Sequence, residues 1–201
     1  MALTNIKWKI NKQQLRQELQ SQLTARVGTS VKSKVQDLIR NALKQHQIYT
    51  SLLDGALYEA FGLHTAPQSV DAVVEKIVSD VNIQVIQKGT ALATIRIEAV
   101  KSDYQEILGI QEAMVQTYKG QLLPWLKWLI GSETAVIANY HIVRGYFPNP
   151  PSRTNKALMK KDGNWSLSQD VTKYSYEPQD NWITQSINTI GPELIKLLKS
   201  I

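Results

Sequence analysis

The sequence predicts an α+β fold with a helical N-terminal part, an antiparallel β-hairpin plus further strands packed on helices, and a long C-terminal helix. Two changes of pattern along the chain support this fold class. Apolar residues recur at three- and four-residue spacing up to about residue 80, which is typical of amphipathic helices. Apolar and polar residues then alternate over 81–99, which indicates two strands, and helical spacing returns after residue 180.

The length of 201 residues corresponds to one domain at roughly 100–200 residues per domain. No linker and no repeat of fixed period divides the chain, so we expect a single α+β domain over 1–201. Within it the pattern separates a helical N-terminal part (1–68), a mixed α/β core (69–168) and a C-terminal helical arm (169–201). No apolar run approaches the roughly 20 residues of a membrane-spanning helix, so we expect no membrane partner.

Four helices are predicted in the first 80 residues from their apolar spacing. Asn11 and Ser30 are the expected N-caps of the first two, because their side chains can accept a backbone hydrogen bond. The third helix is expected to continue past Gly55 and to end at Gly62. The predicted segments are 11–27, 30–45, 52–61 and one that begins at residue 69.

The predicted hairpin consists of residues 81–85 and 91–99, with a turn between them. One of its faces is apolar and the other mostly polar, so the hairpin should be covered on one side only. The spacing over 103–118 is weakly helical. A short helix is expected within 120–131, with Pro124 in its first turn and Gly131 at its end.

The last third of the chain combines short strands and a final helix. A strand is expected over 135–143, and two more, 157–159 and 165–167, flank a turn signal. Asp180 or Asn181 should cap the final helix. The Gly191-Pro192 pair should bend or restart it, because proline lacks the N–H that the helix needs.

The net charge of +6 is unevenly distributed. Residues 1–50 hold nine Lys and Arg against two acidic residues, whereas the other 151 residues hold fourteen basic and fifteen acidic ones. A basic segment of this kind can face phosphate or an acidic partner, or it can be a solvated helix face. The sequence leaves both interpretations open.

The motifs of common enzyme classes are missing from the sequence. There is no cysteine, which excludes disulfides and thiolate sites, and His46, His64 and His141 have no motif partner that would indicate a metal. Neither a phosphate-binding glycine loop nor a nucleophile elbow is present. We therefore expect no catalytic residue, no metal and no cofactor, and no enzymatic function.

The tryptophans fit either of two roles. Trp125 and Trp128 are three residues apart on a predicted helix and share one side of it, so they and Trp182 fit the core or an anchor for a neighbouring subunit. Trp8 has charged neighbours and no apolar partner nearby, which favours a partner contact. The candidate partner-interface residues are Lys7, Trp8, Lys9, Arg16, Trp125, Trp128 and Trp182.

A second basic cluster follows the proline-rich loop at 148–151. It fits a solvated loop, or a surface that faces a DNA channel or the next subunit. Its candidate residues are Arg153, Lys156, Lys160 and Lys161.

Several short sequence motifs follow one another in the second half of the chain, and their order is more specific than any one of them alone. They are Leu123-Pro-Trp-Leu-Lys-Trp-Leu-Ile-Gly131, a strand ending near Val143, Ser152-Arg-Thr-Asn-Lys-Ala-Leu-Met159, Trp165, and Asn181-Trp-Ile-Thr184. Over about residues 70–201 the chain thereby resembles the neck or tail-completion proteins of tailed bacteriophages, also called head–tail connectors. One position departs from the pattern, since Asn155 stands where the family has glycine; asparagine tolerates the left-handed backbone angles that such a turn needs.

The resemblance implies a structural virion protein. Such proteins form homo-oligomeric rings around the DNA channel, between the portal or adaptor side and the tail-tube or tail-terminator proteins. It implies head-to-tail contacts that close on rotation, localisation in the virion after assembly in the host cytoplasm, and non-specific contact with packaged DNA.

Two other functions stay open from the sequence. The first is a tail terminator or another tail or baseplate structural protein. The second is a nucleic-acid-binding protein that acts through its basic N-terminal helices outside any particle.

Overall fold

The computed structural model describes residues 18, 21, 31–88, 92–98, 104–117, 119–130, 140–144, 146, 154, 157–161 and 180–199. In this part of the chain the protein is α+β, mostly helical with short antiparallel pairs of strands. The helices are α2 (Lys32–Gln45), α3 (Gln47–Asp54), α4 (Ala56–Phe61), α5 (Gln68–Ser79), α6 (Gln105–Leu108), the 3-10 helix η2 (Gln111–Ala113), α7 (Trp125–Ile130), α9 (Trp182–Thr189) and α10 (Gly191–Lys199). The strands are β1 (Asn82–Lys88), β2 (Leu92–Glu98), β3 (Val115–Gln116), β4 (Leu122–Leu123), β5 (Tyr140–Arg144) and β6 (Ala157–Lys161).

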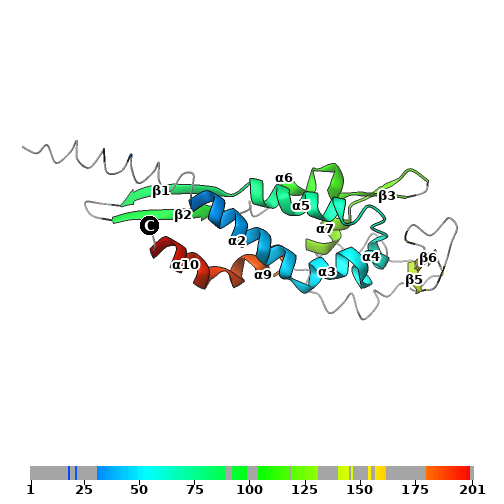
Figure 1. Cartoon of the computed structure of the whole chain (residues 1–201). Helices are drawn as coiled ribbons and strands as arrows, with labels where there is room; N and C mark the ends of the chain where they lie inside the picture. Colours follow the sequence, from blue (N-terminus) through cyan, green and yellow to red (C-terminus); the bar gives the residue numbers. More distant parts are fainter. Residues whose placement is uncertain are drawn as a thin grey trace, which may run out of the picture.

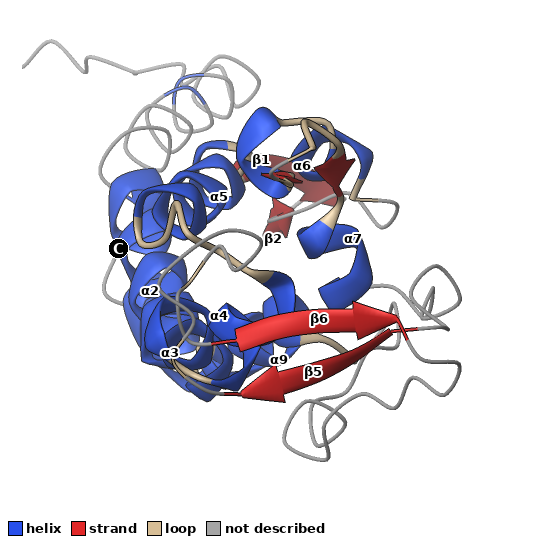
Figure 2. Ribbon diagram, turned by 90° about the vertical axis from the view of Figure 1, so that its right-hand side faces the viewer, coloured by secondary structure: helices blue, strands red, loops and turns tan. Residues whose placement is uncertain are grey.

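The strands form three two-stranded antiparallel pairs, β1–β2, β3–β4 and β5–β6. Figure 1 shows the helices in the middle of an elongated molecule, with β1–β2 extending toward one end and β5–β6 lying at the other. Viewed from that second end, β5–β6 crosses in front of α3, α4 and α9 (Figure 2). The two hairpins are thus separated by the helical part.

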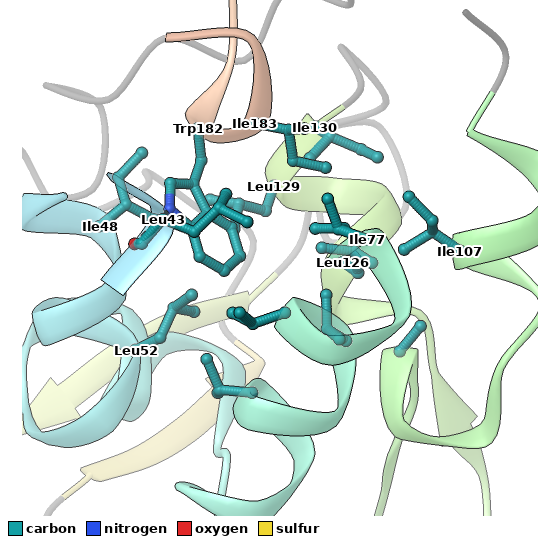
Figure 3. Packing of buried hydrophobic residues seen from close by; sticks show 14 of the residues in the cluster. Leu43, Ile48, Leu52, Ile77, Ile107, Leu126, Leu129, Ile130, Trp182 and Ile183 are labelled. Atoms are coloured by element: carbon teal, nitrogen blue, oxygen red, sulfur yellow. Dashed lines mark hydrogen bonds between the residues drawn. The ribbon is translucent and has the colours of Figure 1, made fainter. Parts of the chain in front are cut away.

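The helices α2 and α5 supply much of the core, because each places an apolar stripe on one face. Val35, Ile39 and Leu43 of α2 are buried, as the predicted spacing requires. Val70, Val73, Val74 and Ile77 of α5 are buried as well. These side chains join those of α3, α7 and α9 in one cluster, part of which is drawn in Figure 3.

The β1–β2 hairpin confirms the alternation predicted from the sequence. Its strands pair in register from Asn82 opposite Glu98 to Lys88 opposite Leu92. At its base Ile83 lies opposite Ile97, and both pack partly buried against the core. A two-stranded hairpin alone is only marginally stable in water, so this contact at the base is what anchors it.

The predicted helix over 52–61 is wrong, because the structure has two helices that meet at Gly55. This residue is extended (φ −128°, ψ −158°), which ends α3 and starts α4. The side-chain hydroxyl of Ser51, itself buried, accepts a hydrogen bond from the backbone N–H of Leu57 at 3.1 Å. The predicted end at Gly62 is confirmed, since Gly62 adopts the left-handed conformation (φ 64°, ψ 47°).

Replacing Gly55 with alanine should destabilise the protein by about 1–3 kcal/mol, the usual cost of overpacking. An added Cβ would lie 2.8 Å from the Cα and 3.2 Å from the carbonyl oxygen of Ser51, both backbone atoms that cannot move aside. The matched control is Gly191→Ala, where a Cβ meets no atom within 4 Å. Urea unfolding of both variants measures the difference. Equal stabilities would contradict this account of the break.

Three later segments also differ from the sequence prediction. The weak helical spacing over 103–118 resolves into α6, η2 and the short strand β3. The strand β6 pairs with β5; its predicted partner 165–167 lies outside the described residues. The C-terminal segment is two helices, α9 and α10, in place of one long helix, and the restart at Gly191-Pro192 is confirmed. Of the predicted helix 11–27 the structure describes residues 18 and 21, both helical, and the predicted cap Ser30 lies outside the described residues.

Candidate interaction surfaces

The tryptophans of α7 and α9 belong to the core. Trp125 and Trp182 have no exposed surface and Trp128 is 6% exposed. The ring of Phe61 packs against both Trp125 and Trp128, with centroids 6.4 and 6.1 Å away, and the indole N–H of Trp125 donates to the carbonyl of Glu112. Of the two predicted roles, the structure shows the core role for all three residues. Their assignment to a partner interface is therefore corrected, since the folded subunit covers these side chains.

The Asn181-Trp-Ile-Thr184 string combines a helix cap, formed by Asn181 and Thr184, with buried core residues between them. The Asn181 side-chain oxygen accepts hydrogen bonds from the backbone N–H groups of Ile183 and Thr184 at 3.0 and 3.2 Å, and the hydroxyl of Thr184 accepts one from the backbone N–H of Asn181. This capping box starts α9. The amide nitrogen of Asn181, fully buried, donates to the hydroxyl of Tyr104 at 3.1 Å. The predicted cap is thus confirmed and has an additional partner far along the chain.

The indole N–H of Trp182 donates to the carbonyl of Leu43 at 3.2 Å. That carbonyl lies in the last turn of α2, where backbone oxygens lack partners within the helix. Figure 3 shows the Trp182 ring pointing into the core cluster toward Leu43. This residue therefore fastens the start of α9 to the end of α2.

Part of the N-terminal basic excess is neutralised within the subunit. Arg40 binds Glu75 of α5 through two hydrogen bonds, 2.8 and 2.9 Å long, and also contacts Asp37 at 2.6 Å. Lys44 contacts Asp71 at 2.8 Å, and the hydroxyl of Tyr49 donates to the same carboxylate at 2.7 Å. We call this set the α2–α5 clasp; its members are Asp37, Arg40, Lys44, Tyr49, Asp71 and Glu75.

The clasp shifts the pKa values of Glu75, Asp71 and Lys44. The hydrogen bonds from Arg40 hold the pKa of Glu75 below its usual range, against an opposing effect of burial. Burial works to raise the pKa of Asp71, but the hydrogen bonds from Lys44 and Tyr49 outweigh it and the pKa is lowered. The hydrogen bond to Asp71 raises the pKa of Lys44. The clasp therefore stabilises the fold near neutral pH, and its contribution is lost as acid protonates the two carboxylates.

Two other N-terminal cations are not part of the clasp. Lys34 is exposed and Lys32 is partly exposed on α2, and neither forms an ion pair among the described residues. The predicted interface residues Lys7, Trp8, Lys9 and Arg16 lie outside the described residues. Fewer basic residues of 1–50 are thus available to bind a partner than the count of nine implies, because Arg40 and Lys44 already pair with Glu75 and Asp71.

The structure places Lys160 and Lys161 in the β5–β6 hairpin. Lys160 lies opposite His141 and Lys161 opposite Tyr140. Arg144 of β5 lies opposite Ala157 of β6. The other two predicted residues of this cluster, Arg153 and Lys156, lie outside the described residues, while Thr154 between them is buried.

A groove of about 570 Å³ lies between the end of α2 and the junction of α9 and α10. Leu38, Ala42 and Ile190 contribute apolar surface to it, and amide, hydroxyl, imidazole and carboxylate groups contribute the rest. The polar residues along the groove are Asn41, Gln45, His46, Gln47, Thr189 and Glu193. Sequence spacing gave no sign of this groove, because its walls come from segments about 140 residues apart in the chain.

Searches of the described residues for two common kinds of site returned nothing. No group of three or more His, Asp or Glu side chains there is placed to hold a metal ion. No helix in the same residues is both long and apolar enough to cross a membrane.

Comparisons of the chain with protein-family models, with curated proteins and with solved structures find no match.

Proposed function

We propose that the chain is a structural virion protein of a tailed bacteriophage, a neck protein that forms a ring around the DNA channel between the portal side and the tail. In this role it has no catalytic function and needs no cofactor. Its partners are further copies of itself, the portal or adaptor proteins on one side, and the tail-tube or tail-terminator proteins on the other.

The observation that carries the proposal is the position of the two hairpins. A closed ring of identical subunits requires two different surfaces per subunit, which meet head to tail. The hairpins β1–β2 and β5–β6 lie at opposite ends of the molecule (Figure 1). Within the described part of the chain, each strand of these pairs bonds only to its own partner, so each hairpin has free edges. Free strand edges are ready templates for contact with another chain.

The hairpins also differ in charge, so the two ends present different surfaces to a partner. The strands β1 and β2 hold two cations, Lys88 and Arg96, and one anion, Glu98, which forms an exposed ion pair with Arg96 at 2.8 Å near the base of the hairpin. The β5–β6 hairpin holds three cations, Arg144, Lys160 and Lys161, and no acidic residue. A cationic hairpin of this kind suits weak, sequence-independent contact with DNA phosphates or an acidic surface on a neighbour.

The strings that resemble neck proteins have a structural role in this chain. The Leu123–Gly131 string contains α7 with its buried tryptophans, and the Asn181–Thr184 string starts α9. These two strings of the resemblance therefore consist largely of residues that determine packing. The assembly role itself is what the following experiment tests.

Reversing the charge of Lys160 and Lys161 together should weaken ring assembly more than folding. The double variant Lys160→Glu/Lys161→Glu replaces two cations with two anions on a short hairpin outside the helical core, so we expect about a tenfold or larger rise in the concentration at which rings half-dissociate. Sedimentation velocity over a concentration series measures it. The two single variants then show which of the two lysines makes the contact.

The matched control is Lys34→Glu, which makes the same charge change at an exposed position of α2. It should leave assembly unchanged, and thermal unfolding should show that all four variants remain folded. Normal rings from the double variant would count against the role of β5–β6 in the ring.

A further inference from the structure

His46 occupies the corner between α2 and α3, and both nitrogens of its ring are engaged. The Nδ1 atom accepts a hydrogen bond from the backbone N–H of Ile48 at 3.2 Å, which caps α3. The Nε2 atom lies 3.1 Å from the side-chain oxygen of Gln185, on α9. One partly buried imidazole therefore links the end of α2, the start of α3 and α9.

These contacts determine which nitrogen carries the proton. The Ile48 amide can only donate, so Nδ1 must be without hydrogen, and Nε2 must carry the hydrogen and donate to Gln185. The side-chain nitrogen of Gln185 donates to Asp180 at 2.8 Å, which is consistent with the side-chain oxygen of Gln185 accepting from His46. A continuous chain of donors thus runs from Ile48 through His46 and Gln185 to Asp180, and it requires neutral His46.

A second proton on the His46 ring is incompatible with these hydrogen bonds. It would bind Nδ1, which would then face the N–H of Ile48 as another donor, and α3 would lose its cap. Burial lowers the pKa of His46 below its usual value, and the hydrogen bond to Gln185 only partly offsets this. Folding is therefore less favourable when this histidine is charged.

The groove beside α2 offers an alternative position for the charged ring. His46 lines it together with Glu193 of α10. The other charged groups nearby already have partners: Asp180, which precedes the N-cap of α9, binds Gln185, and Lys44 of α2 binds Asp71 of α5. Glu193 is exposed and forms no ion pair among the described residues, so its carboxylate is the group in the groove that can attract an imidazolium.

We propose that His46 is a pH-sensitive latch: when neutral it caps α3 and ties this helix to α9, and when protonated it releases both contacts and turns into the groove toward Glu193. The switch is local, because the buried core of α2, α5 and α7 does not include this side chain. It does not depend on the proposed function.

The sign of the pH dependence follows from the contacts. The unfolded chain binds a proton at His46 more readily than the folded chain does, so stability rises with pH in that range. The contribution of the latch is complete above the ordinary histidine pKa of about 6.5 and is lost as the pH falls from there through the lower value of the folded state.

NMR of the full-length protein tests the latch directly. At neutral pH the His46 ring should carry its hydrogen on Nε2 and none on Nδ1. As the pH falls, the ring, the backbone amide of Ile48 and the side-chain amide of Gln185 should shift together with one midpoint below that of free histidine. Hydrogen on Nδ1 at neutral pH, or an Ile48 amide that does not follow the ring, would overturn the proposal.

Three variants complete the test. His46→Asn keeps a good cap that cannot titrate, so its Ile48 amide should show no midpoint and its urea midpoint should fall less than that of the wild type as the pH is lowered. His64→Gln, the matched control, should retain the wild-type response at Ile48. Glu193→Gln should move the His46 midpoint to lower pH by removing the partner of the charged ring. An unchanged midpoint in Glu193→Gln, or a wild-type pH response in His46→Asn, would overturn the latch as stated.

Discussion

Replacing Trp182 with alanine is expected to lower the free energy of unfolding by about 3–5 kcal/mol, the largest effect of any single change discussed for this chain. The side chain has no exposed surface, so its removal leaves a cavity in the core. It also removes the hydrogen bond to the carbonyl of Leu43 that joins α9 to α2. Urea unfolding followed by far-UV circular dichroism measures the loss.

Trp182→Phe separates the two contributions. Phenylalanine fills much of the same volume but has no N–H, so the carbonyl of Leu43 loses its donor while the cavity stays small. We expect a loss clearly smaller than that of the alanine variant. If both variants unfolded at the wild-type urea concentration, the position of Trp182 as the anchor of α9 would be refuted.

Replacing Asn181 with alanine is expected to cost about 2–4 kcal/mol. The change removes the N-cap of α9, typically about 1 kcal/mol. It also leaves the buried N–H of Ile183, the partly buried N–H of Thr184 and the hydroxyl of Tyr104 without this partner. The same unfolding measurement detects the loss.

Asn181→Ser is the control for the cap alone. Serine is also a good N-cap and keeps a side-chain oxygen for the backbone N–H groups, but it cannot reach as far toward Tyr104. Its loss should be smaller than that of alanine. A serine variant as unstable as the alanine variant would show that the bond to Tyr104, and not the cap, is what matters at this position.

The sequence predicted those parts of the fold in which local pattern and tertiary packing agree. The stripe of α2 and the alternation of β1 and β2 follow directly from side-chain periodicity. The break at Gly55 was missed because the apolar spacing runs through it without change. What ends the helix there is the extended backbone of Gly55 and the Ser51 hydroxyl that takes over the capping of α4.

The surfaces were harder to predict than the elements. Spacing placed Trp125 and Trp128 on one side of a helix, but it did not show what that side faces, and the covering ring of Phe61 comes from a different helix. The clasp partners Arg40 and Glu75 lie 35 residues apart, and the latch partners His46 and Gln185 lie 139 apart. Such pairs depend on tertiary packing, which no local motif encodes.

The mass of the purified full-length protein in solution tests the central claim most directly, with electron microscopy of the same sample. The proposed function predicts one discrete oligomer whose mass is a whole multiple of the 22.7 kDa chain, and closed rings with a central opening in the images. A species of 22.7 kDa at every concentration, with no rings, would contradict the proposal that this chain assembles by itself around a DNA channel.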